Sequence, residues 1–130
     1  MANILVIDDE PAILESLSMF LVEKGHKVFT AATGRKGYDF FVEEAPQIVI
    51  MDIRLPDLNG LDILEMMVEK NLPSKIIMIT AYQDMETTIV AIKRGAFDYI
   101  HKPLDVDEIE KSVDRALSIL EIDKKTPSME

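Results

Sequence analysis

The sequence predicts an α/β domain: a single doubly wound parallel sheet of five strands, each followed by a helix, (βα)5. Two observations support this fold class. Short segments that are apolar at every position recur along the chain, which is typical of strands buried on both faces of a parallel sheet. Segments with helical periodicity lie between them in strict alternation, and this order favours right-handed crossovers with helices on both faces. The length of 130 residues suits one such domain.

The predicted strands are short runs that contain almost no polar residue. Each run is too brief for a buried helix, so a strand is the better interpretation. In chain order they are Ile4–Ile7, Val28–Phe29, Ile48–Met51, Ile76–Ile79 and Tyr99–Ile100, of which the second and fifth give the weaker signal.

The predicted helices are defined by apolar stripes and by residues typical of helix ends. The stripes are Ile13, Leu17, Phe20 and Leu21; Tyr38, Phe41 and Val42; Leu61, Leu64 and Val68; Ile89 and Ile92; and Ile109, Val113, Ala116, Leu117 and Leu120. The residues typical of helix ends are Pro11 and Gly25 for the first helix, Pro46 for the second, Asn59-Gly60 and Pro73 for the third, Asp84 and Gly95 for the fourth, and Asp105 for the fifth. We expect one domain over 1–120. Residues 121–130 are expected to form an exposed tail or the start of a linker to an output domain absent from this chain.

The composition excludes several classes of function. A net charge of −10 disfavours general binding to nucleic acid or to an anionic membrane surface. There is no cysteine, so disulfides and thiolate metal sites are excluded, and the two histidines are too few for a typical zinc site. The N-terminus lacks the pattern of a signal peptide, so we expect a cytoplasmic protein.

Ionisable and hydroxyl side chains follow four of the five predicted strands. Asp8 and Asp9 follow the first, Asp52 the third, Thr80 the fourth and Lys102 the fifth. In the flavodoxin-like strand order 2-1-3-4-5 these four strand ends are neighbours, at the edge where ligands of open α/β sheets bind. We therefore expect these side chains to share one site.

Three aspartates at close range repel one another unless a cation neutralises them. Mg²⁺ (or Mn²⁺) prefers such oxygen ligands, and a lysine and a threonine hydroxyl can bind a phosphoryl group. Together these groups predict a phosphoryl-transfer site. Taken singly, each residue has an ordinary explanation: Asp8 and Asp9 as helix-capping carboxylates, Asp52 as a turn residue, Thr80 as a cap and Lys102 as a surface lysine.

Four motifs resemble receiver domains of two-component response regulators (CheY-like), over nearly the whole chain. They are the segments 4–10, ending in Asp8-Asp9-Glu10; 51–60, starting at Met51-Asp52; 79–82, with Thr80-Ala81; and Lys102-Pro103. The resemblance implies the following roles: Asp52 as phospho-acceptor; Asp9, Asp52 and the backbone carbonyl of Arg54 as metal ligands, with Asp8 acting through water; Thr80, Ala81 and Lys102 in phosphoryl binding and signalling; and Tyr99 and Pro103 in switching, with a cis bond before Pro103.

The same resemblance implies a sensor histidine kinase as partner, a signalling role rather than an enzyme's turnover, and a homodimer on phosphorylation. The segment 95–105 is similar to receivers of nitrogen-regulator-class transcription activators, so we expect control of transcription through the face built by the fourth helix, fifth strand and fifth helix. A stand-alone single-domain regulator is the alternative. A haloacid-dehalogenase-like phosphatase would need an acid two residues beyond its nucleophile, where Arg54 follows Asp52, and Asp8-Asp9-Glu10 would repel the phosphate of a flavin mononucleotide.

Overall fold

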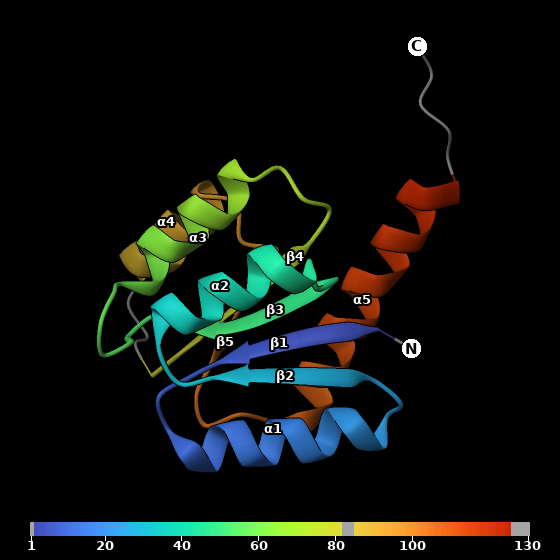
Figure 1. Ribbon diagram of the computed structural model, residues 1–130, viewed down its shortest axis with the longest axis horizontal. Helices are drawn as coiled ribbons and strands as arrows, with labels where there is room; N and C mark the ends of the chain where they lie inside the picture. Colours follow the sequence, from blue (N-terminus) through green and yellow to red (C-terminus); the bar gives the residue numbers. More distant parts are fainter. Residues whose placement is uncertain (1, 82–84, 126–130) are drawn as a thin grey trace.

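The computed structural model describes residues 2–81 and 85–125 and confirms the alternation of strands and helices (Figure 1). The strands are β1 (Asn3–Ile7), β2 (Lys27–Ala31), β3 (Ile48–Asp52), β4 (Lys75–Thr80) and β5 (Asp98–His101). The helices are α1 (Pro11–Glu23), α2 (Gly34–Glu44), α3 (Gly60–Glu69), α4 (Met85–Lys93) and α5 (Val106–Lys125). Helix α5 thus continues beyond Leu120, and the domain boundary at 120 stays a prediction.

All neighbouring strands are parallel, and their order is β2-β1-β3-β4-β5, as the sequence predicted. Strand β1 is an interior strand, since Ile4 is in register with Val28 of β2 on one side and with Ile48 of β3 on the other. Strands β2 and β5 form the two edges of the sheet. The reversal of winding direction next to β1 brings the carboxyl ends of β1 and β3 together, at the position where such sheets bind ligands.

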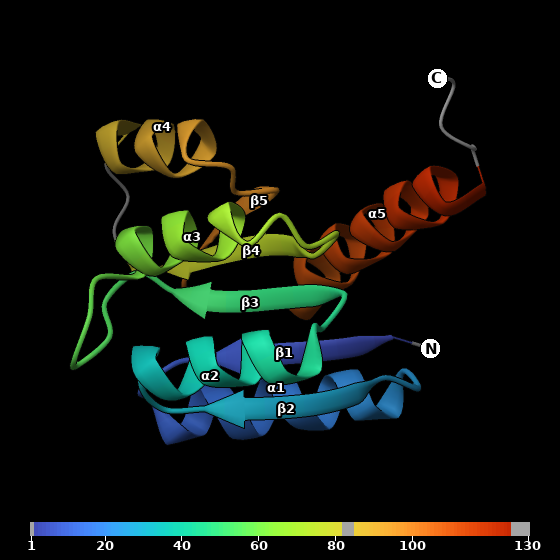
Figure 2. The same cartoon turned by 45° about the horizontal axis from the view of Figure 1, so that its top comes forward.

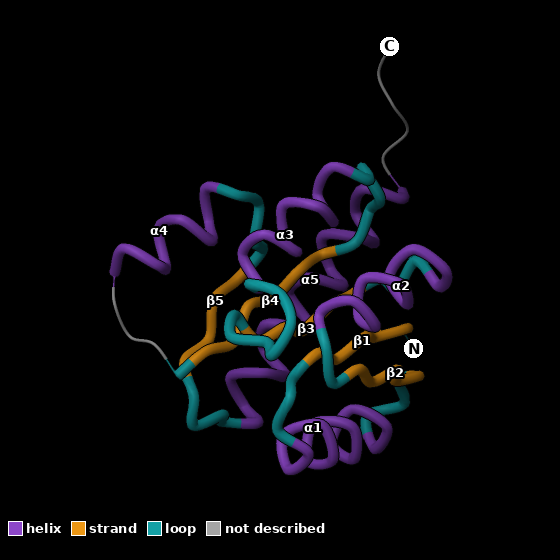
Figure 3. The backbone as a smooth tube through the Cα atoms, turned by 60° about the vertical axis from the view of Figure 1, so that its left-hand side comes forward, coloured by secondary structure: helices purple, strands orange, loops and turns teal. Residues whose placement is uncertain are grey.

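The two faces of the sheet carry separate hydrophobic cores, because successive side chains of a strand point to opposite faces. Leu5, Ile7 and their equivalents on β3 and β4 pack against α2, α3 and α4. Ile4, Val6 and their equivalents pack against α1 and α5. Figures 2 and 3 show α1 and α2 on opposite sides of the sheet. This three-layer packing makes the strands rigid supports for the residues at their ends.

The predicted helix ends are largely confirmed. Pro11 is the first residue of α1, and Gly25 beyond its end has a φ of 93° that favours glycine. The side chain of Asn59 accepts a hydrogen bond from Leu61 N–H (2.8 Å) at the start of α3. Asp105 caps α5 through Asp107 N–H (2.9 Å). The predicted cap of the fourth helix, Asp84, lies outside the described residues.

Four residues predicted to face the core are exposed instead. They are Val42, Val68, Ile89 and Ile92. Helix α2 turns Gly34, Gly37 and Phe41 inward, where a Cβ on Gly37 would lie only 2.4 Å from Ile7 Cδ1. This close approach of α2 to β1 sets the rotation of the helix and leaves Val42 outside. Helix α3 buries Ile63, Leu64 and Met67, so Val68 lies on its outer side.

Candidate functional site

The predicted site residues lie at the carboxyl ends of adjacent strands. Asp8 directly follows β1, Asp52 ends β3, Thr80 ends β4 and Lys102 follows β5. The backbone N–H of Lys102 donates to the Thr80 carbonyl (2.8 Å), which continues the β4–β5 pairing up to the lysine. Parallel pairing therefore delivers residues far apart in the sequence to one edge of the sheet.

The ammonium of Lys102 lies at the centre of this site. Its Nζ is 2.7 Å from Glu10 Oε1, 2.9 Å from Asp8 Oδ2 and 3.1 Å from Asp52 Oδ2. The Lys102 side chain is only 11% exposed. Burial by itself lowers the pKa of Lys102, but the close contacts with the carboxylates of Glu10, Asp8 and Asp52 outweigh it and raise the pKa above its usual value. Lys102 is therefore a fixed positive charge.

Asp8 is fully buried, with an exposed fraction of 0%. Its Oδ1 accepts a hydrogen bond from Glu10 N–H (2.9 Å), while Oδ2 has no well-aligned hydrogen-bond donor although Lys102 Nζ is close. Burial raises the pKa of Asp8, and repulsion from Asp52 adds to this effect, while the hydrogen bond from Glu10 N–H and the attraction to Lys102 oppose it. A buried oxygen with an incomplete set of partners is suited to a further cationic ligand.

Three carboxylates, those of Asp8, Glu10 and Asp52, have oxygen atoms that all lie within 4.8 Å of one another. Oxygen-only donors of this kind suit a hard divalent cation such as Mg²⁺ or Mn²⁺. The residues present therefore fit the predicted metal, and the buried Asp8 Oδ2 is the observation that favours it. Asp9, a predicted ligand, is exposed and is not part of this cluster. Its role stays a prediction.

The other predicted residues lie on β4 and β5 or in the segments that follow β3, β4 and β5. Thr80 is buried, whereas Ala81 and Pro103 are exposed. Arg54 N–H donates to Asp52 Oδ1 (3.3 Å), which places the Arg54 main chain next to the acid. The Lys102–Pro103 peptide bond is cis, as the resemblance implied. Tyr99 of β5 is half-buried and packs edge-on against the ring of His101, with ring centroids 5.1 Å apart.

Sequence reasoning missed two residues of this region, Glu10 and Asp57. Glu10 was interpreted as part of the first motif and as an acid that would repel a flavin phosphate, and its contact with Lys102 depends on the fold. Asp57 lies in the loop between β3 and α3, and its carboxylate accepts hydrogen bonds from the N–H groups of Gly34 (2.8 Å) and Arg35 (2.9 Å). Asn59-Gly60 predicted the start of a helix, but nothing in the sequence indicated that the loop before it would contact the start of α2.

The base of the same loop is closed by its own backbone. Arg54 and Asn59 form an isolated antiparallel bridge, and Gly60 N–H donates to the Ile53 carbonyl (2.6 Å). A Cβ on Gly60 would lie 2.5 Å from the Asp52 carbonyl oxygen, so only glycine permits this approach. The main chain that follows Asp52 is therefore held at both the base and the tip of the loop.

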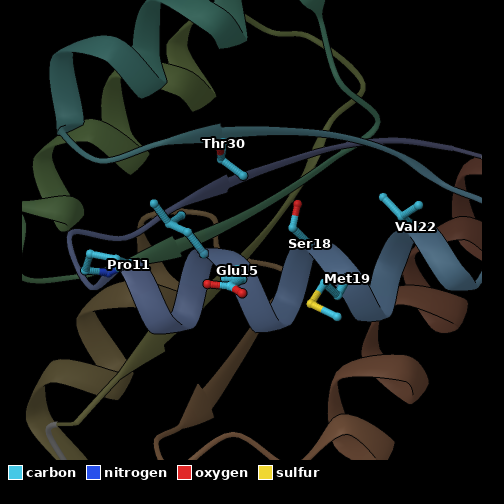
Figure 4. A pocket seen from close by; sticks show the side chains of 7 residues that line it. Pro11, Glu15, Ser18, Met19, Val22 and Thr30 are labelled. Carbon is cyan, nitrogen blue, oxygen red and sulfur yellow. The ribbon is translucent and has the colours of Figure 1, made fainter.

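A hollow of about 500 Å³ lies along α1, away from the carboxylates (Figure 4). Its lining is mostly apolar and consists of Pro11, Leu14, Glu15, Ser18, Met19, Val22 and Thr30. None of the predicted site residues lines it, so the chemistry at the strand ends does not involve it.

None of the helices in the described part of the chain has the length and apolar character needed to cross a bilayer.

Residues 4–114 match the family model described as "Response regulator receiver domain". The regulatory protein AtoC of Escherichia coli strain K12 is 36% identical over 123 residues, which cover 95% of this chain and 27% of AtoC. The chain spans less than half the length of the curated regulators that it matches.

Solved structures give the same similarity. A response regulator receiver domain protein from Clostridium thermocellum superposes with a TM-score of 0.87 at 34% identity, covering 94% of this chain and 98% of that one. The beryllofluoride-activated NtrC4 receiver domain dimer superposes with a TM-score of 0.84 at 31% identity, covering 91% of this chain and 98% of that one.

Proposed function

The chain belongs to the family of response regulator receiver domains, and we propose that its Asp52 accepts a phosphoryl group from the phosphohistidine of a sensor histidine kinase. The observation that carries the proposal is the pairing of a nearly buried Asp52 with the Lys102 ammonium at 3.1 Å. A nucleophile next to a fixed cation is the arrangement that phosphoryl transfer requires, because catalysis of this reaction is largely positioning and charge stabilisation.

In the proposed step an oxygen of Asp52 forms a bond to phosphorus while the P–N bond of the donor breaks. The electron pair of that bond returns to the donor imidazole, and the product is an aspartyl phosphate that water later hydrolyses. Lys102 stabilises the negative charge on the phosphoryl oxygens, and the hydroxyl of Thr80 donates to one of them in the product. The hydrogen bond from Arg54 N–H to Asp52 Oδ1 holds the carboxylate in one orientation.

We propose that Asp8, Asp9, Asp52 and the backbone carbonyl of Arg54 hold Mg²⁺ (or Mn²⁺). The bound cation supplies charge neutralisation between carboxylates and phosphoryl oxygens. The protein's own residues prepare this site without it. Asp8 is held by Glu10 N–H, and the loop that carries Arg54 is closed at its base by Gly60.

We further propose that phosphorylation shifts an equilibrium between two conformations of the face formed by α4, β5 and α5. Thr80 and Tyr99 are the expected links, since Thr80 ends β4 and Tyr99 lies on the paired strand β5, in register with Met78. The ratio of the two conformations can shift only as far as the phosphoryl group's interaction free energy differs between them. A homodimer through this face, cytoplasmic location and control of transcription through a separate output domain belong to the same proposal.

The test is incubation with acetyl phosphate and Mg²⁺ followed by intact-mass measurement. Wild type is expected to gain one phosphoryl mass, and Asp52→Ala is expected to gain none. Asp39→Ala is the matched control, because it removes an exposed aspartate on α2 and should leave the gain unchanged. Phosphorylation of Asp52→Ala at the wild-type rate would show that another residue is the acceptor.

A further inference from the structure

The Lys102 ammonium has three N–H donors and three carboxylate neighbours within 3.1 Å. Glu10 and Asp52 accept hydrogen bonds from this ammonium, and Asp8 forms a third close ion pair with it. A phosphoryl oxygen that approaches Lys102 therefore competes with these three carboxylates for the ammonium. The identity of the displaced carboxylate then affects how readily the phosphoryl group is accepted.

The three contacts differ in what it costs to break them. Asp8 is fully buried, and in the described part of the chain Lys102 is the cation that its Oδ2 contacts, so without a bound metal its release would leave a charge unpaired away from water. Asp52 carries the phosphoryl group itself and stays next to the ammonium. The side chain of Glu10 is 56% exposed, so water can solvate its carboxylate as soon as Lys102 leaves. Glu10 is the partner released at the lowest cost.

We propose that Glu10 is a positioning residue that competes with the phosphoryl group for the Lys102 ammonium. This inference rests on the proposed function of Asp52. Glu10 makes the shortest of the three contacts, 2.7 Å, and it reaches the ammonium from the start of α1 rather than from a strand. In the unphosphorylated state it holds Lys102 in place. On phosphorylation it gives up the ammonium and turns to water, while Asp8 keeps its ion pair.

The opposing possibility is that Glu10 is a metal ligand, since its oxygen lies within 4.8 Å of those of Asp8 and Asp52. The two roles predict opposite effects of one substitution. Removing a competitor strengthens binding of a phosphoryl group, whereas removing a ligand weakens binding of the metal. Glu10→Gln separates them, because glutamine keeps the shape of the side chain and loses its charge.

The experiment measures two affinities in wild type, Glu10→Gln and Glu15→Gln. The last variant is the matched control, since it removes a charge from an exposed glutamate of α1 outside the carboxylate cluster. The first affinity is that for Mg²⁺ alone, measured by titration calorimetry. The second is that for beryllofluoride, the phosphoryl mimic, at saturating Mg²⁺, measured by fluorine NMR. Neither readout requires turnover.

We expect Glu10→Gln to bind beryllofluoride about two- to fivefold more tightly than wild type, the range for losing one partly exposed ion pair. Its Mg²⁺ affinity should stay within about twofold of the Glu15→Gln value. Unchanged or weaker beryllofluoride binding would overturn the inference, and so would a tenfold loss of Mg²⁺ affinity. If wild type itself bound no beryllofluoride, the proposed function would fail as well, so the two failures are distinguishable.

Discussion

The carboxylate of Asp57 accepts a hydrogen bond from the backbone N–H of Gly34, 2.8 Å away, and so joins the loop after β3 to the first turn of α2. Its second oxygen accepts from Arg35 N–H at 2.9 Å. A carboxylate at a helix N-terminus satisfies N–H groups that have no partner within the helix and interacts favourably with the helix dipole. Asp57 therefore acts as a cap for α2 that is supplied from another element.

Replacing Asp57 with alanine is expected to destabilise the protein by about 1 kcal/mol, the usual effect of losing a helix cap. Urea unfolding followed by circular dichroism measures this change. Asp39→Ala is the matched control, since it removes an exposed carboxylate from the middle of the same helix. Equal midpoints for Asp57→Ala and Asp39→Ala would contradict a capping role.

The stabilisation by Asp57 should depend on pH. The hydrogen bonds from Arg35 N–H and Gly34 N–H lower the pKa of Asp57 below its usual value of 3.8. A carboxyl with a lowered pKa in the folded state contributes stability that is present above the unfolded pKa and is lost as the pH falls through the folded pKa. The difference in unfolding free energy between wild type and Asp57→Asn should be constant above about pH 5 and shrink below about pH 4. A difference that grew on acidification would contradict this sign.

Two glycine substitutions in this region should differ in their cost. A Cβ on Gly34 would lie 2.3 Å from Ile63 Cδ1, the end of a side chain that can rotate away. A Cβ on Gly60 would lie 2.5 Å from the carbonyl oxygen of Asp52 and 2.7 Å from Ile53 Cα, which are backbone atoms. We expect Gly60→Ala to cost about 3 kcal/mol and Gly34→Ala about 1 kcal/mol, in the range for overpacking. Urea unfolding of both variants tests the order, and the reverse order would refute it.

Arg94, just beyond α4, forms ion pairs with Asp62 (3.1 Å) and Glu65 (3.6 Å) of α3. Because these pairs are exposed, Arg94→Ala is expected to change the global unfolding free energy by no more than about 0.5 kcal/mol. Ala91 is the one α4 residue in the buried core, so α4 is held by few apolar contacts. The loss of the ion pairs should therefore affect the local opening of α4 more than the global unfolding of the protein. Hydrogen exchange of the α4 amides should become faster in Arg94→Ala, and unchanged exchange would show that the ion pairs do not hold the helix.

Added Mg²⁺ should raise the melting temperature, because a ligand that binds only the folded state stabilises it by mass action. At a concentration about 100-fold above its dissociation constant the gain would be about 2.7 kcal/mol. NaCl at equal ionic strength controls for screening of the acidic surface. Asp8→Asn should lose most of this gain, since it removes the charge of the buried carboxylate. An equal gain in Asp8→Asn would remove Asp8 from the metal site.

Much of the fold was readable from the sequence, since apolar runs marked each strand and proline, glycine and capping residues marked most helix ends. Which face of each helix packs against the sheet was harder to predict. Val42 and Val68 fit apolar stripes as well as the residues that are buried, and the choice between them depends on how closely each helix approaches the sheet. The close approach of α2 to β1 depends on Gly37, which has no side chain and so adds nothing to an apolar stripe in the sequence.

The meeting of Asp8, Asp52 and Lys102 at one edge of the sheet was predictable, because parallel pairing alone brings these strand ends together. Their functional roles stay predictions. Which carboxylates form the cluster was harder to predict. In an extended chain residues i and i+2 lie on the same side, and beyond β1 it is Glu10, not Asp9, whose carboxylate joins that of Asp8. Two contacts, Lys102 with Glu10 and Asp57 with Gly34, join residues that are far apart in the sequence. No local sequence pattern therefore predicts them.

The placement of β5 at the edge of the sheet has a consequence for self-association. An edge strand offers unpaired backbone groups to which a strand of another molecule can add. Strand β5 has only four residues, its Asp98 side chain is engaged by Ser112 (2.6 Å) and Arg115 of α5, and Pro103 follows shortly after its end. Short length, a charged residue and a nearby proline all discourage edge-to-edge addition. The strand that leads to Lys102 is thus protected against aggregation through the outer edge of the sheet.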